Sequence, residues 1–339
     1  MEKNPKKITI IAVVALFALT VFFSTYKLSE SPPVWYDEGW YFQSADNLAT
    51  LGDYGIQFSP GHITHVSMLQ TVSYPLIYPM ALWLKAFGSS VLSGRSLMVI
   101  FILLLLAAAY MLSKRLSGSA IAVGTLFLLA TFPPLYGNGK SILGETPGLF
   151  YLLAFLLLFN FAKSAKSKKT LWLILSGLFA GLCLVTKPFF FLLAPAVAIC
   201  LIIEWRRGTI TPREAMIFIA AGVIPFLVWL GVQLGPGDSV SSLISYYSNP
   251  YSYQAVAGGH GIFATVWLNI QSLVKSLNTL YTLFMMLVWL GSFFVRKASK
   301  SAIPVEEMIA FCFALLVCLA FLRIGTIFRY LFAAQVIAL

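Results

Sequence analysis

The feature that most constrains this chain is a series of apolar segments that run for about 17 to 20 residues without a charged side chain. An α-helix rises about 1.5 Å per residue, so about 20 such residues cross the roughly 30 Å hydrocarbon core of a membrane. Only 10% of the 339 residues are charged, whereas soluble proteins average about 25%. The chain is therefore predicted to be an all-α integral membrane protein.

Nine segments are predicted to span the membrane. They are residues 8–26, 97–112, 120–135, 147–162, 171–186, 189–203, 215–234, 277–295 and 308–322. A tenth apolar segment begins at Tyr330 and reaches Leu339 after ten residues, which gives about 15 Å of helix. The prediction is a polytopic transmembrane helix bundle of about 9–10 spans in a single domain, residues 1–339. Either a longer protein continues beyond Leu339, or the last segment ends inside the bundle.

The basic residues predict the orientation, because Lys and Arg are retained on the cytoplasmic side of a membrane. With a cytoplasmic N-terminus, 15 of the 23 Lys and Arg residues fall in internal segments. The formal charge of +11 then reflects topology, and no nucleic-acid partner is needed to explain it. We expect a multi-pass plasma-membrane protein with its function on the external face. Two long external segments, 27–95 with interfacial helices and 235–276, lie on that face.

Two adjacent carboxylates, Asp37 and Glu38, follow the first predicted span. Asp37 is the expected N-cap of a helix over residues 38–51, and Gly52 is the expected residue just past its end. Neighbouring aromatic residues suit the headgroup region, so this helix is predicted to lie along the membrane surface. Capping by itself explains both acids. Alternatively, a carboxylate in a medium of low dielectric can act as a general base.

Several basic residues lie at external positions of this topology. They are Lys85, Arg95, Lys140, Lys187 and Arg329. A cation at the mouth of a span can extend to lipid headgroups, whereas cations that converge at one depth would bind phosphate oxygens. Glu145 begins the fourth span on the same face, where an acid also suits the first turn of a helix.

All three histidines, His62, His65 and His260, fall in the external segments. Together with Tyr74 they are candidates for binding an acceptor or a sugar. Their spacing supplies no third metal ligand, so no metal site and no required cofactor are predicted. A divalent metal between the acids is compatible with the sequence, although nothing in the spacing requires one. Motifs of soluble nucleotide-sugar transferases, ATPases and the common hydrolases do not occur.

Four short motifs occur in order on the predicted external face. They are Tyr36-Asp37-Glu38-Gly39, Tyr74-Pro75 leading to Arg95, Thr186-Lys187-Pro188, and Phe328-Arg329-Tyr330-Leu331. In this order they resemble the C-type, polyprenyl-phosphate-dependent glycosyltransferases. That family includes protein O-mannosyltransferases, lipid A aminoarabinose transferases and bacterial members of unassigned acceptor. The similarity extends over nearly the whole chain.

The resemblance implies transfer of a sugar from a polyprenyl-phosphate donor to a protein, glycolipid or cell-envelope polymer outside the membrane. Asp37 would be the catalytic base, with Glu38 as its partner and Glu145 as the second external acid. Arg95, Lys187 and Arg329 would bind the donor phosphate or hold the site together, and Lys140 and Lys85 are further phosphate candidates. A single base without a covalent intermediate predicts inversion at the sugar. The late motif departs from the family, because no prolines follow Arg329-Tyr330.

A transporter or flippase of a lipid-linked or small polar substrate is the alternative. Charges inside the spans and interrupted helices in repeated halves would indicate that class. In this chain the spans are almost free of charge, and the charges lie in the long external segments. The sequence therefore favours the glycosyltransferase.

Overall fold

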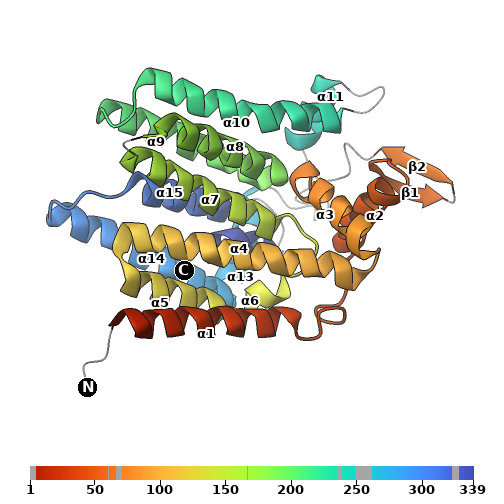
Figure 1. The fold of residues 1–339 in the computed structure, drawn as a ribbon, viewed down its shortest axis with the longest axis horizontal. Helices are drawn as coiled ribbons and strands as arrows, with labels where there is room; N and C mark the ends of the chain where they lie inside the picture. Colours follow the sequence, from red (N-terminus) through yellow and green to blue (C-terminus); the bar gives the residue numbers. More distant parts are fainter. Residues whose placement is uncertain are drawn as a thin grey trace. The chain divides into compact units, whose positions relative to one another are not determined.

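The computed structural model describes residues 5–59, 61–65, 71–165, 167–234, 239–248, 262–322 and 328–339. These residues are mostly helical (Figure 1). The chain divides into two compact units. Unit 1 contains Met1–Phe190 and Arg213–Gly235, and unit 2 contains Phe191–Pro212 and Pro236–Leu339.

Seven helices in the described residues are long and apolar enough to cross a membrane. They are α1 (Pro5–Thr25), α4 (Val91–Ser117), α7 (Glu145–Ser164), α8 (Lys169–Thr186), η1 (Pro188–Leu192) continued by α9 (Leu193–Arg206), α10 (Pro212–Gln233) and α14 (Leu277–Ala298). The remaining predicted spans form shorter helices. These are α5 (Ser119–Ala130), α15 (Val305–Phe321), η2 (Phe328–Leu331) and α16 (Phe332–Ala338). The predicted all-α membrane bundle is confirmed.

The helices of unit 1 pack along their lengths. Helix α4 packs against α5 and α7, and α7 packs against α8. Close packing of α8 on α10 depends on two glycines: a Cβ at Gly177 would lie 2.2 Å from the carbonyl oxygen of Phe218, and one at Gly181 would lie 2.3 Å from that of Gly222. Small residues allow this close backbone approach in membrane helices.

The segment that was predicted to be the first external one folds at one end of the unit 1 helices, where Figure 1 shows α2 (Tyr36–Thr50), α3 (Tyr74–Phe87) and a hairpin. The hairpin pairs β1 (Gly55–Ser59) with β2 (His62–His65) in antiparallel register, and no strand was predicted there. The Asn47 side chain donates to the carbonyl oxygen of Gly55 at 2.9 Å and ties the hairpin to α2. We call this end of unit 1, with the adjoining ends of α1, α4, α7 and α8 and residues 133–144, the loop end.

The start of α2 differs from the prediction. The carbonyl of Trp35 accepts the N–H of Gly39 at 3.1 Å, so the helix begins at Tyr36 with Trp35 as its N-cap and no capping side chain. The prediction that Asp37 caps the helix is wrong, and Asp37 lies in the first turn. The prediction for the other end is confirmed, because Gly52 follows the helix with a φ of 77°.

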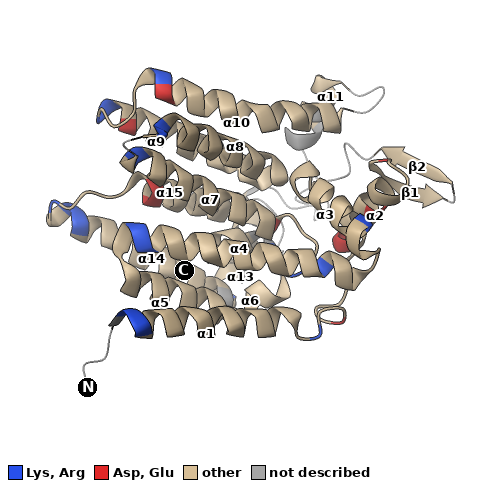
Figure 2. Cartoon of the chain, in the orientation of Figure 1, with Lys and Arg blue, Asp and Glu red and all other residues tan. Residues whose placement is uncertain are grey.

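Basic residues gather at the opposite end of unit 1, which we call the basic end (Figure 2). Helix α1 begins there with Lys6 and Lys7 near its start, α4 ends there with Lys114 and Arg115, and α8 begins there with Lys169. This separation of charge is the pattern from which a cytoplasmic N-terminus was predicted.

Unit 2 has its own packing. Helix α9 packs against α15, α15 packs against α16, and α13 (Ile262–Lys275) packs against α14. A short helix, α11 (Val240–Ser248), belongs to the same unit. The Asn269 side chain donates to the carbonyl of Leu322 at 3.0 Å and fastens α13 to the end of α15.

Candidate active site

All buried charged side chains in the described part of unit 1 lie at the loop end. They are Glu38, Arg95, Lys140, Glu145 and Lys187, each at most 4% exposed. Moving a charge out of water is costly unless a partner compensates it. This end of the unit therefore has to compensate buried charges that the rest of its described residues do not contain.

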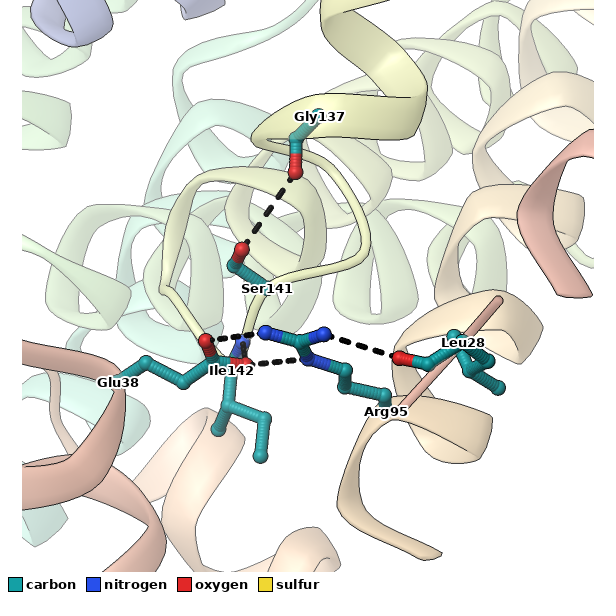
Figure 3. A network of polar contacts seen from close by, with 6 residues as sticks. All are labelled: Leu28, Glu38, Arg95, Gly137, Ser141 and Ile142. Carbon is teal, nitrogen blue, oxygen red and sulfur yellow. Dashed lines mark hydrogen bonds and ion pairs between the residues drawn. The ribbon is translucent and has the colours of Figure 1, made fainter. Parts of the chain in front are cut away.

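Glu38 and Arg95 form a two-pronged ion pair (Figure 3). The Arg95 Nε donates to Glu38 Oε1 at 2.8 Å, and Nη2 donates to Oε2 at 2.7 Å. The third guanidinium nitrogen, Nη1, donates to the carbonyl oxygen of Leu28 at 2.9 Å. Glu38 Oε1 also accepts the backbone N–H of Ile142 at 3.0 Å. Parallel donors of this kind fix geometry as well as charge.

Local structure brings these groups together. Glu38 lies in the first turn of α2. Arg95 lies near the start of α4, where the Ser90 side chain accepts the N–H of Ser93 as an N-cap. Gly94 lets α4 approach its neighbours, because a Cβ there would lie 2.6 Å from the Ile142 Cδ1 atom. The pair therefore joins α2, α4 and the segment around Ile142.

Residues 139–144 connect α6 (Pro133–Gly137) to α7 and are buried throughout. Connecting segments usually lie on the surface, so this one needs internal partners. Thr146 Oγ1 donates to the carbonyl of Gly139 at 2.9 Å. Lys140 Nζ donates to the carbonyl of Tyr26, just beyond α1, at 3.0 Å. Burial, and then the nearby Arg95 cation, lower the pKa of Lys140 from its usual value.

The second buried pair joins α7 to the end of α8. Lys187 Nζ lies 2.6 Å from Glu145 Oε1. Glu145 is the first residue of α7, as predicted, and Lys187 follows α8 in an extended conformation before Pro188 begins η1. The carbonyl of Thr186 accepts the N–H of Ser73 at 3.1 Å, which fastens the start of α3 to the same place.

Asp37 differs from its neighbour in environment. Glu38 is buried against Arg95, whereas Asp37 is half-buried. Successive helical residues project about 100° apart, so the ion pair of Glu38 sets the rotation of α2 and hence the direction of Asp37. The adjoining Trp35 and Tyr36 are 60% and 67% exposed, which suits the predicted position at the membrane surface.

The predicted acceptor-binding or sugar-binding residues are not part of the two buried ion pairs. Tyr74 donates its hydroxyl to the carbonyl of Pro225 at 3.1 Å, and burial, then Tyr78, raise its pKa to about 12. His65 Nε2 lies 3.0 Å from the carbonyl oxygen of Val232, and His62 is exposed on the same strand. His260 lies outside the described residues.

Besides Lys140, two more predicted phosphate ligands are not part of the two ion pairs. Lys85 is exposed in the last turn of α3, and Arg329 belongs to unit 2 in η2. Within the described residues, no group of three or more His, Cys, Asp or Glu side chains could hold a metal ion. Metal dependence stays a prediction.

Sequence reasoning named the five buried charged residues but not their pairing. The backbone partners, which are the N–H of Ile142 and the carbonyls of Tyr26 and Leu28, were also missed. Backbone groups leave no signal in a sequence. Gly94, directly before Arg95, is the one sequence feature that could have indicated a close approach at this point.

Comparisons with known proteins agree with this architecture. The sequence model of the dolichyl-phosphate-mannose-protein mannosyltransferase family matches residues 75–230. The apo oligosaccharyltransferase of Archaeoglobus fulgidus superposes with a TM-score of 0.64 at 16% identity, over 100% of this chain and 50% of its own. ArnT from Cupriavidus metallidurans, bound to undecaprenyl phosphate, gives a TM-score of 0.65 at 13% identity, over 96% of this chain and 58% of its own.

A further structure of the Archaeoglobus fulgidus enzyme, AglB with an inhibitory peptide and a dolichol-phosphate, gives a TM-score of 0.60 at 15% identity, over 98% of this chain and 49% of its own. A search of curated protein sequences found no match. The chain thus spans about half the length of these structural relatives. The family match and the shared fold together confirm the predicted resemblance to the C-type, polyprenyl-phosphate-dependent glycosyltransferases, and this chain has their membrane-protein fold.

Proposed function

We propose that this chain is a membrane glycosyltransferase that moves a sugar from a polyprenyl-phosphate donor to an acceptor on the non-cytoplasmic face. The observation that carries the proposal is the Glu38–Arg95 ion pair, which fixes the first turn of α2 and with it Asp37. Within the described part of unit 1, the buried charged side chains all lie at this one end, where hydrogen bonds and ion pairs hold them in defined positions. Pre-organised groups of this kind are what catalysis of sugar transfer needs.

Asp37 acts as the general base in this proposal. The hydroxyl of an acceptor is a poor nucleophile until a base accepts its proton. Glu38 already accepts hydrogen bonds from Arg95 and from Ile142, so its role is to position the turn. Arg95, which donates from all three nitrogens, holds Glu38 and does not contact the donor.

The reaction follows from the bond that breaks. The acceptor oxygen attacks the anomeric carbon as the carbon–oxygen bond to the phosphate breaks, and the released polyprenyl phosphate gains negative charge. Cations stabilise that charge. A direct attack assisted by one base inverts the anomeric carbon. The Glu145–Lys187 pair keeps a second acid and a second cation at the loop end.

The donor class is supported by the relatives. ArnT is bound to undecaprenyl phosphate, and AglB is bound to a dolichol-phosphate and an inhibitory peptide. A lipid-linked donor also suits the external face, because its isoprenoid chain stays in the bilayer. The gathering of basic residues at the other end of unit 1 supports a cytoplasmic N-terminus and an external loop end. The acceptor is a protein, a glycolipid or an envelope polymer.

Cleavage of the donor tests the proposal. Purified protein is incubated with a panel of polyprenyl-phosphate sugars and candidate acceptors, and released polyprenyl phosphate is measured. We expect release by the wild type and a loss of about 10²- to 10⁴-fold in Asp37→Asn. Asp53→Asn is the matched control, because Asp53 is an exposed acid between α2 and β1.

Two outcomes would contradict the proposal. Release by Asp37→Asn at the wild-type rate would remove Asp37 as the base. Movement of the intact donor across vesicles that contain the protein, with no release of phosphate from any donor, would indicate the transporter class instead.

A further inference from the structure

Lys140 differs from the other buried charged residues of unit 1. Arg95 is paired with Glu38, and Lys187 is paired with Glu145. Among the described residues, Lys140 has no carboxylate partner, and its contact is the carbonyl oxygen of Tyr26 at 3.0 Å. The five buried charged residues of unit 1 are therefore three cations and two carboxylates.

The Lys140 ammonium has more donors than the described residues satisfy. An ammonium carries three N–H donors, and the described part of the chain supplies one acceptor. The side chain is 3% exposed, so bulk water gives it little compensation. Like-charge repulsion from Arg95 adds to the effect of burial, and both lower the pKa of Lys140. An anion beside the ammonium would oppose both effects.

We propose that Lys140 binds the phosphate group of the polyprenyl-phosphate donor, an inference that rests on the proposed function. The excess positive charge of the five buried residues is then the charge that the donor phosphate neutralises. Arg95 and Lys187 hold their carboxylates at 2.7 Å and 2.6 Å, so each pair is formally neutral. Lys140 thus combines a buried positive charge with N–H donors beyond the one that its contact with Tyr26 uses.

A purely structural role for Lys140 makes different predictions. Its contact with Tyr26 lies just beyond the C-terminal end of α1, where a cation also interacts favourably with the helix dipole. A residue that only stabilises this end lowers the thermal stability when it is replaced and leaves ligand preference unchanged. A phosphate ligand behaves in the opposite way, because removing an uncompensated buried charge relieves a cost in the ligand-free protein.

The test compares undecaprenyl phosphate with undecaprenol, which has the same chain and no charge. Binding of each to the purified full chain is measured for the wild type, Lys140→Met and Lys140→Arg, together with the thermal unfolding midpoint without ligand. Lys140→Met retains side-chain length and removes the charge, and Lys140→Arg retains the charge. Lys27→Met is the matched control, because Lys27 is an exposed lysine one residue after Tyr26.

We expect Lys140→Met to bind undecaprenyl phosphate about 10- to 100-fold more weakly than the wild type, as for loss of a charged hydrogen bond. Undecaprenol binding and the unfolding midpoint should not fall, Lys140→Arg should recover most of the phosphate affinity, and Lys27→Met should match the wild type. Unchanged phosphate preference in Lys140→Met, with or without a lower midpoint, would overturn the inference. If Lys140→Met does not fold, Lys140→Gln takes its place, and a folded Lys140→Gln that keeps the wild-type preference for the phosphate would overturn the inference.

A failure of the proposed function would be seen in the wild-type protein and not in the variants. Wild-type protein that binds undecaprenyl phosphate no better than undecaprenol would contradict the donor class itself, whatever the variants do. A wild type that prefers the phosphate, with Lys140→Met retaining that preference, would leave the donor class standing and remove only Lys140.

Discussion

The two ends of unit 1 treat charge in opposite ways. At the loop end, Glu38 and Arg95 are 1% and 0% exposed and are held by several hydrogen bonds. At the basic end, the Lys169–Glu214 ion pair joins side chains that are 32% and 21% exposed. The comparison separates charges that water stabilises from charges that depend on the protein for compensation.

This fold accepts an energetic cost at the loop end and not at the basic end. A buried ion pair is often no more stabilising than apolar residues of the same volume, yet loss of one partner leaves an uncompensated charge. An exposed pair contributes little and is screened by salt. Burial of charge at the loop end therefore points to a role in function, whereas charge at the basic end is the pattern from which the orientation is predicted.

The largest effect on stability is expected for Arg95→Ala. The substitution leaves the Glu38 carboxylate buried without its partner, so we expect a loss of about 3–5 kcal/mol in the free energy of unfolding. Denaturant unfolding of the purified protein in a membrane mimetic measures it. Glu38→Leu combined with Arg95→Met should recover most of the loss. If Arg95→Ala alone is as stable as the wild type, the buried ion pair at the loop end does not differ in stability from the exposed pair at the basic end.

A smaller effect is expected for Glu145→Gln. The amide still offers an oxygen to Lys187 but no longer compensates its charge, so the expected loss is about 1–3 kcal/mol. A double-mutant cycle with Lys187→Met measures the interaction energy of Glu145 with Lys187. Residues in contact typically show a coupling of about 0.5–3 kcal/mol. No measurable coupling would mean that the contact of 2.6 Å contributes nothing to stability.

The smallest effect is expected at the basic end. Lys169→Gln and Glu214→Gln should each change the free energy of unfolding by about 0–1 kcal/mol, because both side chains are partly exposed. The same unfolding measurement serves, repeated at low and high salt. A loss as large as that of Arg95→Ala would show that the basic end also depends on its ion pair.

Much of the architecture could be predicted from the sequence. Long uncharged segments determine membrane helices directly, since length and hydropathy are properties of the chain itself. The nine predicted spans all correspond to helices, although residues 120–135 give the shorter α5, after which Pro133 begins α6. The hairpin was missed, although Pro60-Gly61 between two short segments is a turn signal.

The candidate site was predictable by residue and not by partner. Asp37, Glu38, Arg95, Glu145 and Lys187 were identified from their positions near the ends of spans. Which acid pairs with which cation depends on tertiary packing, as in the contact of Gly94 with Ile142 that brings α4 to the buried segment. The cap assigned to Asp37 was wrong for a related reason, because the backbone of Trp35 begins α2 without a side chain.

The most direct test of the central claim compares two neighbouring residues, Asp37 and Glu38. Donor cleavage and the thermal unfolding midpoint are measured side by side for Asp37→Asn and Glu38→Gln. We expect Asp37→Asn to unfold at the wild-type temperature and to lose about 10²- to 10⁴-fold in turnover, while Glu38→Gln unfolds at a clearly lower temperature. Full turnover in Asp37→Asn, together with a Glu38→Gln protein that is stable and inactive, would contradict the central claim by making Glu38 the base.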